Sequence, residues 1–378
     1  MIGQLDYTTL QQLWWIIASL VGSLFLFLNF VQGGQTLLFT LPKNDKEKSL
    51  IINSLGRKWE LTFTTLVLFG GALFAAFPKF YATSFGGAYW VWMLILFTFI
   101  IQAVSYEYRK KPQNFLGAKT YEVFLFINGS VGILLIGAAI GTFFTGSSFS
   151  INEMNQVTWQ TPYYGLEAAL NFFNLSLGIF LVLNARVLGA MYLLNNIEHA
   201  EINVGCRRLA WINFMWSLPF LLFVLAKLLL MEGHAIRPEN GEIFLQKWKY
   251  LQNLIGNPLL LLFLLTGLGL VIYGIFVTRF KGKNSGIWFS GPGTVLVGLT
   301  LFGLAGLNDT VFYPSTYDLQ SGLTIYNASS SHYTLTAMSY VALAIPFVVA
   351  YIAYVWRQMD KRQLSISDLS GKGSNKLY

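Results

Sequence analysis

Long apolar runs alternate with short polar connections along most of this 378-residue chain. A helix of about 20 apolar residues crosses a lipid hydrocarbon core that is about 30 Å thick. Each run is long enough to do so with a modest tilt. We therefore predict an all-α polytopic membrane protein with about nine transmembrane helices. The runs are residues 13–31, 61–77, 88–104, 121–144, 166–188, 209–230, 254–277, 287–307 and 336–356.

Positive charges are distributed unevenly among the connections between the runs. Every second connection, together with the C-terminal segment, holds nineteen Lys and Arg residues in all, whereas the other connections hold four. Short loops rich in Lys and Arg stay on the cytoplasmic side of a membrane. We therefore expect the N-terminus outside, the C-terminus in the cytoplasm and an odd number of spans. The nineteen cations lie in residues 39–60, 107–120, 191–208, 278–286 and 357–378.

The composition agrees with a membrane protein and excludes most soluble classes. The chain is 54% hydrophobic, 16% aromatic and only 11% charged, so a soluble form would expose too much apolar surface. Its net charge of +8 is largely the loop charge just described, which predicts no nucleic-acid partner. We expect a single transmembrane domain over residues 1–364, with the basic segment 39–60 as a loop. A polar cytoplasmic tail would follow over residues 365–378.

The few histidines do not mark a haem site. His199, His234 and His332 all fall in connections or at the ends of runs. An intramembrane haem needs axial ligands such as His or Met, and a transmembrane His pair would be the usual sign. No metal-spaced cluster of Cys, His or carboxylates occurs either. We therefore predict that this chain alone binds no haem and no metal.

Polar residues gather at the predicted cytoplasmic ends of the first three runs. Gln32 follows the first run, Glu60 precedes the second, and Glu107 and Arg109 follow the third. Glu60 and Arg109 each have a structural interpretation. An acid in the first turn of a helix stabilises the helix by about 0.3–1 kcal/mol through the helix dipole, and an Arg at the membrane interface extends its side chain into the lipid headgroups. The functional interpretation is a hydrated route for proton uptake, because polar groups at membrane depth are costly. Both interpretations stay open at this point.

Several stretches of the chain form distinctive motifs. The most specific are residues 56–60 (GRKWE) and 68–82 (LFGGALFAAFPKFYA), which resemble the second helix of subunit II of cytochrome bd-type quinol oxidases. Matches extend from the first span to the last residue. They include Trp14-Trp15, residues 106–109 (YEYR), residues 313–315 (YPS), residues 323–330 (LTIYNASS) and the final residues 376–378 (KLY).

The resemblance implies two four-helix bundles plus one peripheral helix, in the bacterial cytoplasmic (inner) membrane. It implies a heterodimer with a haem-bearing subunit I that holds two b-type haems and one d-type haem, or a third b-type haem instead. Such a complex reduces dioxygen to water with electrons from quinol and protons from the cytoplasm. Small single-helix subunits and membrane lipid are further partners. This chain would support subunit I without catalytic residues of its own, and Trp59 is the candidate contact for a structural quinone.

Two departures from the family pattern reduce the number of residues that could carry protons. Many relatives have Asp-Gly-Phe-Asp where this chain has Asn29-Phe30-Val31-Gln32, so both acids are amides here. Glu60 stands where many relatives have Asp. The proton-path candidates are therefore Glu60, Glu107, Arg109 and Gln32, of which only the two glutamates are acids that could take up and release a proton.

Two alternatives belong to other functional classes. A secondary transporter would also be polytopic, but it would place charged groups near the membrane midplane, whereas the ionisable residues here cluster at the ends of runs. A purely structural membrane subunit agrees with every observation made before the family resemblance. The proteins that purify with the chain would distinguish these alternatives from the oxidase.

Overall fold

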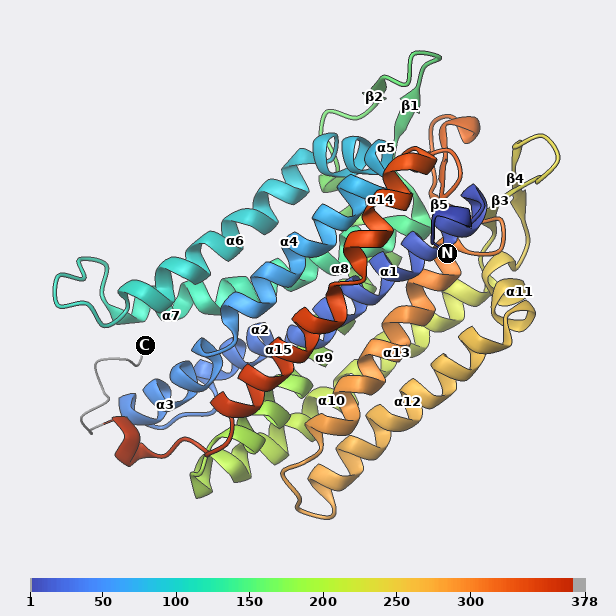
Figure 1. The fold of residues 1–378 in the computed structure, drawn as a ribbon. Coiled ribbons are helices and arrows are strands. Elements are labelled where there is room, and N and C mark those ends of the chain that lie inside the picture. Colours follow the sequence, from blue (N-terminus) through green and yellow to red (C-terminus); the bar gives the residue numbers. More distant parts are fainter. Residues whose placement is uncertain (1, 370–378) are drawn as a thin grey trace.

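The computed structural model describes residues 2–369, and nine helical segments in that part of the chain are long and apolar enough to cross a membrane. They run side by side in Figure 1, so the predicted all-α membrane architecture is confirmed. The first four segments form one bundle. They are α1 (Tyr7–Leu28) continued by α2 (Phe30–Gln35), α3 (Asp45–Gly56) continued by α4 (Trp59–Ala76), α6 (Tyr89–Tyr108), and α7 (Ala118–Ile127) continued through the π-helical turn η4 (Asn128–Gly132) into α8 (Ile133–Thr145).

The next four segments form a second bundle, and the ninth lies against the outside of the first. α8 and α2 both pack along α9, and α1 packs along α13, so the two bundles share an extensive interface. The second bundle comprises α9 (Phe172–Asn196), α10 (Ala200–Leu230), α12 (Pro258–Arg279) and α13 (Ile287–Gly306), and the ninth segment is α14 (His332–Ala342) followed by α15 (Ile345–Met359).

The two ends of the molecule differ in character (Figure 1). One end, here called the strand end, carries the N-terminus and three two-stranded antiparallel sheets. The opposite end, here called the basic end, carries segments 40–58, 109–117, 197–208, 280–286 and 360–369, which hold most of the Lys and Arg residues. The sheets pair β1 (Phe149–Ile151) with β2 (Val157–Trp159), β3 (Gly233–Ile236) with β4 (Ile243–Gln246), and β5 (Val311–Tyr313) with β6 (Leu323–Thr324). Short helices and turns are α5 (Pro78–Tyr81), α11 (Lys249–Gly256), Ile2–Gln4, Thr36–Phe39, Ala82–Gly86, Leu166–Leu170, Leu319–Ser321 and Ile366–Leu369.

The prediction of a loop over residues 39–60 was wrong, because most of this segment is helix α3. The Asn44 side chain accepts a hydrogen bond from the backbone N–H of Glu47 at 3.0 Å, and the Glu47 carboxylate accepts one from the backbone N–H of Lys43 at 2.7 Å. This reciprocal arrangement starts the helix and is close to a capping box, although the carboxylate reaches the N–H of the residue before the N-cap. The hydrophilic residues of the first turn resemble a loop in composition, although the apolar residues that follow are buried. These are Leu50, Ile51, Ile52 and Leu55.

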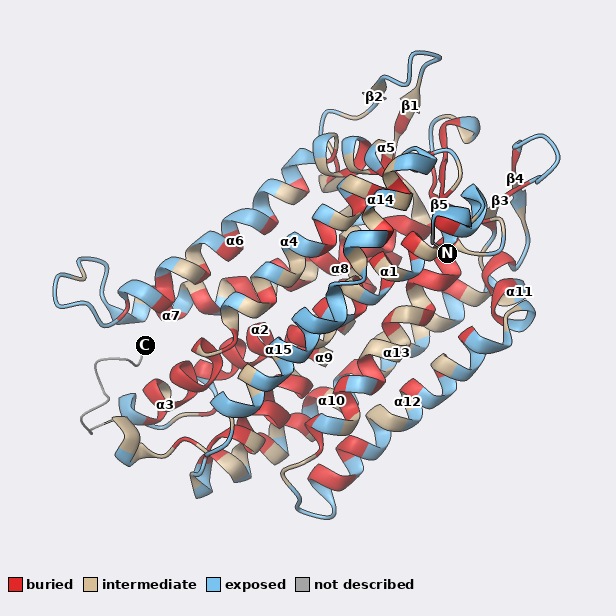
Figure 2. Cartoon of the chain, in the orientation of Figure 1, coloured by how far each residue is buried: buried red, intermediate tan, exposed pale blue. Residues whose placement is uncertain are grey.

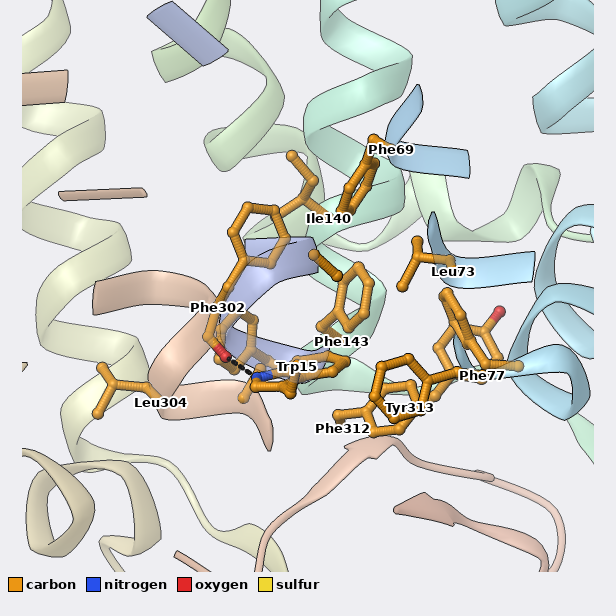
Figure 3. Packing of buried hydrophobic residues seen from close by; sticks show 14 of the residues in the cluster. Trp15, Phe69, Leu73, Phe77, Ile140, Phe143, Phe302, Leu304, Phe312 and Tyr313 are labelled. Carbon is orange, nitrogen blue, oxygen red and sulfur yellow. Dashed lines mark hydrogen bonds between the residues drawn. The ribbon is translucent and has the colours of Figure 1, made fainter. Parts of the chain in front are cut away.

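Trp15 lies at the centre of the largest hydrophobic cluster (Figure 3). Its indole N–H donates to the carbonyl oxygen of Phe302 in α13 at 2.9 Å. Its ring packs on Phe312 at a centroid distance of 4.6 Å and meets Phe77 and Phe143 edge-on. One side chain from the Trp14-Trp15 motif thus joins the first, second, fourth and eighth spans at the strand end.

The ninth segment is peripheral, as the resemblance implies. No residue of α15 is buried, and Figure 2 shows it almost entirely exposed across the front of the first bundle. The end of α15 is attached to the rest of the protein at the basic end. Lys58 Nζ is 2.9 Å from an Asp360 carboxylate oxygen there, and both side chains are largely buried. The Arg57 guanidinium donates to the Met359 carbonyl oxygen at 3.1 Å. Residues 366–369 pack on α3, and residues 370–378 of the predicted tail lie outside the described residues.

Candidate functional site

One face of α6 carries a stripe of buried polar side chains. Thr98, Gln102 and Tyr106 follow one another at four-residue intervals, and Ser105 and Arg109 lie beside them toward the basic end. Residues spaced in this way share one side of a helix. At 1.5 Å per residue the stripe is about 16 Å long, roughly half the thickness of a bilayer core. We call these five residues the α6 stripe.

Two interruptions of regular helix pack together beside this stripe. The first span breaks at Asn29, between α1 and α2, and the fourth span contains the π-helical turn η4. A Cβ atom on Gly129 of η4 would lie 2.2 Å from the carbonyl oxygen of Gln32, so only glycine fits there. The amide nitrogen of Asn128 donates to the Thr98 hydroxyl at 3.4 Å. Single π turns occur frequently at functional sites.

Five buried amide side chains on α2, α6 and the two interruptions form what we call the amide cluster. Seven of their oxygen and nitrogen atoms have no hydrogen-bond partner among the described residues. An unsatisfied buried polar atom costs about 1–3 kcal/mol, and ordered water commonly supplies the partner that the protein does not. The cluster is therefore suited to holding water. Its members are Asn29, Gln32, Gln35, Gln102 and Asn128.

A buried ion cluster closes the α6 stripe at the basic end. Arg109 donates to one carboxylate oxygen of Glu122 on α7 from Nη2 at 2.8 Å and from Nε at 3.2 Å. Arg109 also donates to the Ser49 hydroxyl at 3.4 Å. Lys48 Nζ lies 3.0 Å from the other oxygen of Glu122. Two cations thus share one carboxylate, and the three charges hold α3, α6 and α7 together.

The structure separates the four predicted proton-path residues into two groups. Gln32 and Arg109 are buried, in the amide cluster and the ion cluster respectively. Glu60 and Glu107 are exposed on the surfaces of α4 and α6. The side-chain hydrogen bonds of Arg109 go to Glu122 and Ser49, and none goes to Glu60.

Trp59, the residue predicted to contact a quinone, lies next to the α6 stripe. Its indole stacks on the ring of Tyr106, with centroids 5.6 Å apart and planes inclined by 11°. The Tyr106 hydroxyl in turn accepts a hydrogen bond from the Gln35 amide at 2.9 Å. One face of the indole is therefore covered by the protein.

The histidines do not fit an intramembrane haem. His199 caps the start of α10 at the basic end, His234 lies in β3, and His332 begins α14 at the strand end. Within residues 2–369 no three His, Cys, Asp or Glu side chains come together as they would around a metal ion.

Sequence reasoning missed Glu122 and Asn128, although both lie in the fourth apolar run. Glu122 is the only acid in the run at residues 121–144, and a lone acid in an apolar run could have indicated an ion pair. Asn128 lies six residues further on. The π-helical turn at Asn128 has no comparable signature in the sequence, because it depends on how closely Gly129 approaches the first span.

Comparison with known proteins agrees with this architecture over almost the whole chain. The chain is 28% identical over 373 residues to "Cytochrome bd-I ubiquinol oxidase subunit 2" of Escherichia coli (strain K12), covering 95% of this chain and 96% of that one. It is 27% identical to "Probable cytochrome oxidase subunit 2" of Haemophilus influenzae, covering 93% and 94%. Its fold matches a chain in the structure of bd oxidase from Geobacillus thermodenitrificans with a TM-score of 0.66 at 13% identity, over 93% and 98% of the two chains. The family model for cytochrome bd terminal oxidase subunit II matches residues 10–359, and the chain therefore belongs to this family.

Proposed function

We propose that this chain is the haem-free subunit II of a quinol-oxidising cytochrome bd oxidase in a bacterial inner membrane. Family membership over residues 10–359 supports this function over a secondary transporter. In this proposal the partner is a haem-bearing subunit I, which holds two b-type haems and a d-type or third b-type haem. Small single-helix subunits, lipid and a structural quinone near Trp59 complete the proposed complex.

The basic end faces the cytoplasm in this proposal. Its support is the excess of Lys and Arg in the connections at that end, nineteen against four. The N-terminus and the three small sheets would then lie outside. Protons taken from the cytoplasm would meet this subunit at the ion cluster of Arg109, Glu122 and Lys48.

The amide cluster is the observation that supports a part in proton uptake. Amide side chains do not ionise near neutral pH, but water held among them can pass protons along hydrogen bonds. The α6 stripe extends from Arg109 to Thr98, so water beside it would reach about halfway across the membrane. Glu60 and Glu107 are two further carboxylic acids at the same end. Because they are exposed here, their role requires that subunit I cover them in the complex.

The experiment is quinol-dependent oxygen uptake per haem in the purified complex. Gln102→Leu removes two unpartnered amide atoms with little change in volume, so the complex should assemble while turnover per haem falls several-fold. Gln11→Leu is the matched control, because the Gln11 amide is buried at the strand end and donates to Ser329 at 2.6 Å, far from the stripe. Normal turnover in Gln102→Leu would show that the amide cluster takes no part in proton uptake. The role of this subunit would then be structural.

A further inference from the structure

Arg186, near the middle of α9, is a cation without a counter-charge. Its Nε donates to the side-chain oxygen of Asn213 on α10 at 2.8 Å, and its Nη1 donates to the hydroxyl and the carbonyl oxygen of Thr36 at 2.8 and 3.3 Å. All three acceptors are neutral. The remaining nitrogen, Nη2, has no hydrogen-bond partner among residues 2–369, and the side chain is partly exposed. The protein therefore binds two of the three guanidinium nitrogens and leaves the charge unpaired.

The helices that surround Arg186 offer it no acid. α2 and α10 both pack along α9. The segments that contain α2, α9 and all but the first turn of α10 have no Asp or Glu; they are residues 7–44, 168–197 and 202–231. Within the described part of the chain no carboxylate forms an ion pair with Arg186. The buried cations Arg109 and Lys58, by contrast, lie 2.8 and 2.9 Å from a carboxylate oxygen. A counter-charge for Arg186 must therefore come from outside these helices.

The position of Arg186 along the bundle places its charge inside the hydrocarbon core. Arg207 on α10 marks the basic end, because it donates to Gly282 and Asn284 in the connection between α12 and α13. Asn213, the partner of Arg186, follows Arg207 by six residues, which is about 9 Å along a helix. A charge at this depth is costly, and ionisable residues within membrane spans commonly mark functional sites. A long Arg side chain can meet a lipid headgroup that dips toward it.

Neighbouring hydrogen bonds hold the guanidinium in one orientation. The Thr36 hydroxyl donates its own proton to the carbonyl oxygen of Gly33 at 2.6 Å, so toward Arg186 it acts as an acceptor. The Asn213 amide nitrogen donates to the carbonyl oxygen of Leu209 at 2.7 Å, and the amide oxygen is directed toward Arg186. Thr36 and Asn213 are both buried. These bonds fix Nε and Nη1, whereas Nη2 and the positive charge are available to an anion.

From this oriented and unpaired guanidinium, we infer that the junction of α2, α9 and α10 binds the phosphate group of a membrane phospholipid. A phosphate oxygen accepts from Nη2 of Arg186, and the phosphate supplies the missing negative charge. The lipid comes from the leaflet at the basic end. Free inorganic anions share this chemistry, but a site within the hydrocarbon core favours a phosphate that is attached to acyl chains. The inference does not depend on the proposed oxidase function, since its test measures lipid binding rather than turnover.

Photocrosslinking tests the site without any variant. The purified complex is placed in nanodiscs of phosphatidylglycerol that contain a trace of photoreactive phosphatidylglycerol or of photoreactive diacylglycerol, each with a diazirine beside the glycerol. Crosslinked peptides are mapped by mass spectrometry. The control surface is the exposed Ile272, which precedes the end of α12 at Arg279 by seven residues and so lies at a similar depth.

The phospholipid probe should label residues 36–40 and 209–213 at least threefold more strongly than Ile272. Diacylglycerol lacks the phosphate, so it should label the two surfaces equally. Equal labelling by the phospholipid would overturn the inference, because it would indicate bulk lipid only. Equal enrichment of both probes at residues 36–40 and 209–213 would also overturn it, because the phosphate would then contribute nothing.

Three variants test the cation itself. Arg186→Gln removes the charge, so phospholipid labelling of residues 36–40 and 209–213 should fall to the level of Ile272. Arg186→Lys keeps the charge and should retain at least half of the enrichment. Arg279→Gln removes an exposed cation at the end of α12 and should leave the enrichment unchanged. Unchanged enrichment in Arg186→Gln would overturn the inference. If Arg186→Gln fails to assemble, the comparison of the two probes in the unmodified complex still decides the matter.

Competition identifies the source of the phosphate. Inorganic phosphate in large molar excess over the lipid should leave the enrichment unchanged. Its loss would show that the site takes a free anion and would overturn the lipid assignment. Displacement of the photoreactive phospholipid by an equal amount of isoprenoid quinone would show that the guanidinium binds a carbonyl oxygen of the quinone ring, and this would overturn the phosphate assignment.

Discussion

Arg109 donates two hydrogen bonds to one carboxylate oxygen of Glu122, at 2.8 and 3.2 Å, and both side chains are buried. The pair joins the end of α6 to the start of α7 at the basic end. Lys48 on α3 reaches the second oxygen of the same carboxylate. The Glu122 carboxylate thus links α3, α6 and α7 at the basic end.

We expect Glu122→Gln to destabilise the protein by about 3 kcal/mol, because it leaves Arg109 buried without a counter-charge. The exposed Glu107→Gln should change stability by less than about 0.5 kcal/mol. The double variant Glu122→Gln/Arg109→Gln should lose less than the sum of the two single losses, since the residues act as a pair. Thermal unfolding of the purified complex compares the wild type with Glu122→Gln, Glu107→Gln, Arg109→Gln and the double variant. Equal melting of Glu122→Gln and Glu107→Gln would contradict the ion cluster.

The Lys58–Asp360 pair should hold the peripheral helix in place. Asp360→Asn leaves a buried ammonium unpaired, so we expect a loss of about 3 kcal/mol and faster proteolysis between α15 and residue 369. The exposed pair Arg362–Asp368, 3.6 Å apart, provides the control, and Arg362→Gln should have almost no effect. If limited proteolysis cuts both variants at the same rate, α15 is held by other contacts.

Glu60→Gln should slow turnover of the assembled oxidase several-fold while assembly stays near normal. The substitution keeps the volume of the side chain but removes its ability to exchange protons. Haem content per complex reports assembly, and oxygen uptake per haem reports turnover. Thr64→Ala, on the same exposed face of α4, is the control. Unchanged turnover in Glu60→Gln would mean that this acid only favours the start of α4.

The sheet of β3 and β4 should weaken in acid. Burial lowers the pKa of His234, so the folded state favours the neutral ring. The unfolded segment binds a proton first as the pH falls through about 6.5, and stability is therefore lost below that pH and kept above it. Hydrogen exchange of β3 and β4, corrected for intrinsic rates, should speed up on acidification in the native protein and not in His234→Gln. An equal response in both would exclude His234 as the cause.

Much of the fold could be predicted because its signals are local. The nine spans follow from runs of apolar residues, and Trp15 proved central as part of a motif in the first span. The loop predicted over residues 39–60 failed because a capping box and a loop share the same polar composition. The feature that distinguishes helix α3 from a polar loop is its set of buried apolar residues, Leu50, Ile51, Ile52 and Leu55.

The site was less predictable because it depends on pairing between distant segments. Gln32 and Arg109 can be identified by their position at the ends of runs, yet the residues that they meet lie on other helices. Glu122 pairs with Arg109 thirteen residues away, and Gly129 meets the backbone of Gln32 across the bundle. Glu60 and Glu107 also lie near the ends of apolar runs, but their side chains are exposed. Whether a residue at the end of a run is buried depends on which face of its helix it occupies, and position in the sequence alone does not give this.

The most direct test of the oxidase assignment is to purify this chain by an affinity tag from its native membrane and record the absorption spectrum. The account predicts a partner membrane protein in equal amount, haem bands that follow that partner, and quinol-dependent oxygen uptake. The chain expressed alone should show no stoichiometric haem. A chain that purifies without a haem-bearing partner, or that keeps haem by itself until one His or Met is replaced, would contradict the assignment.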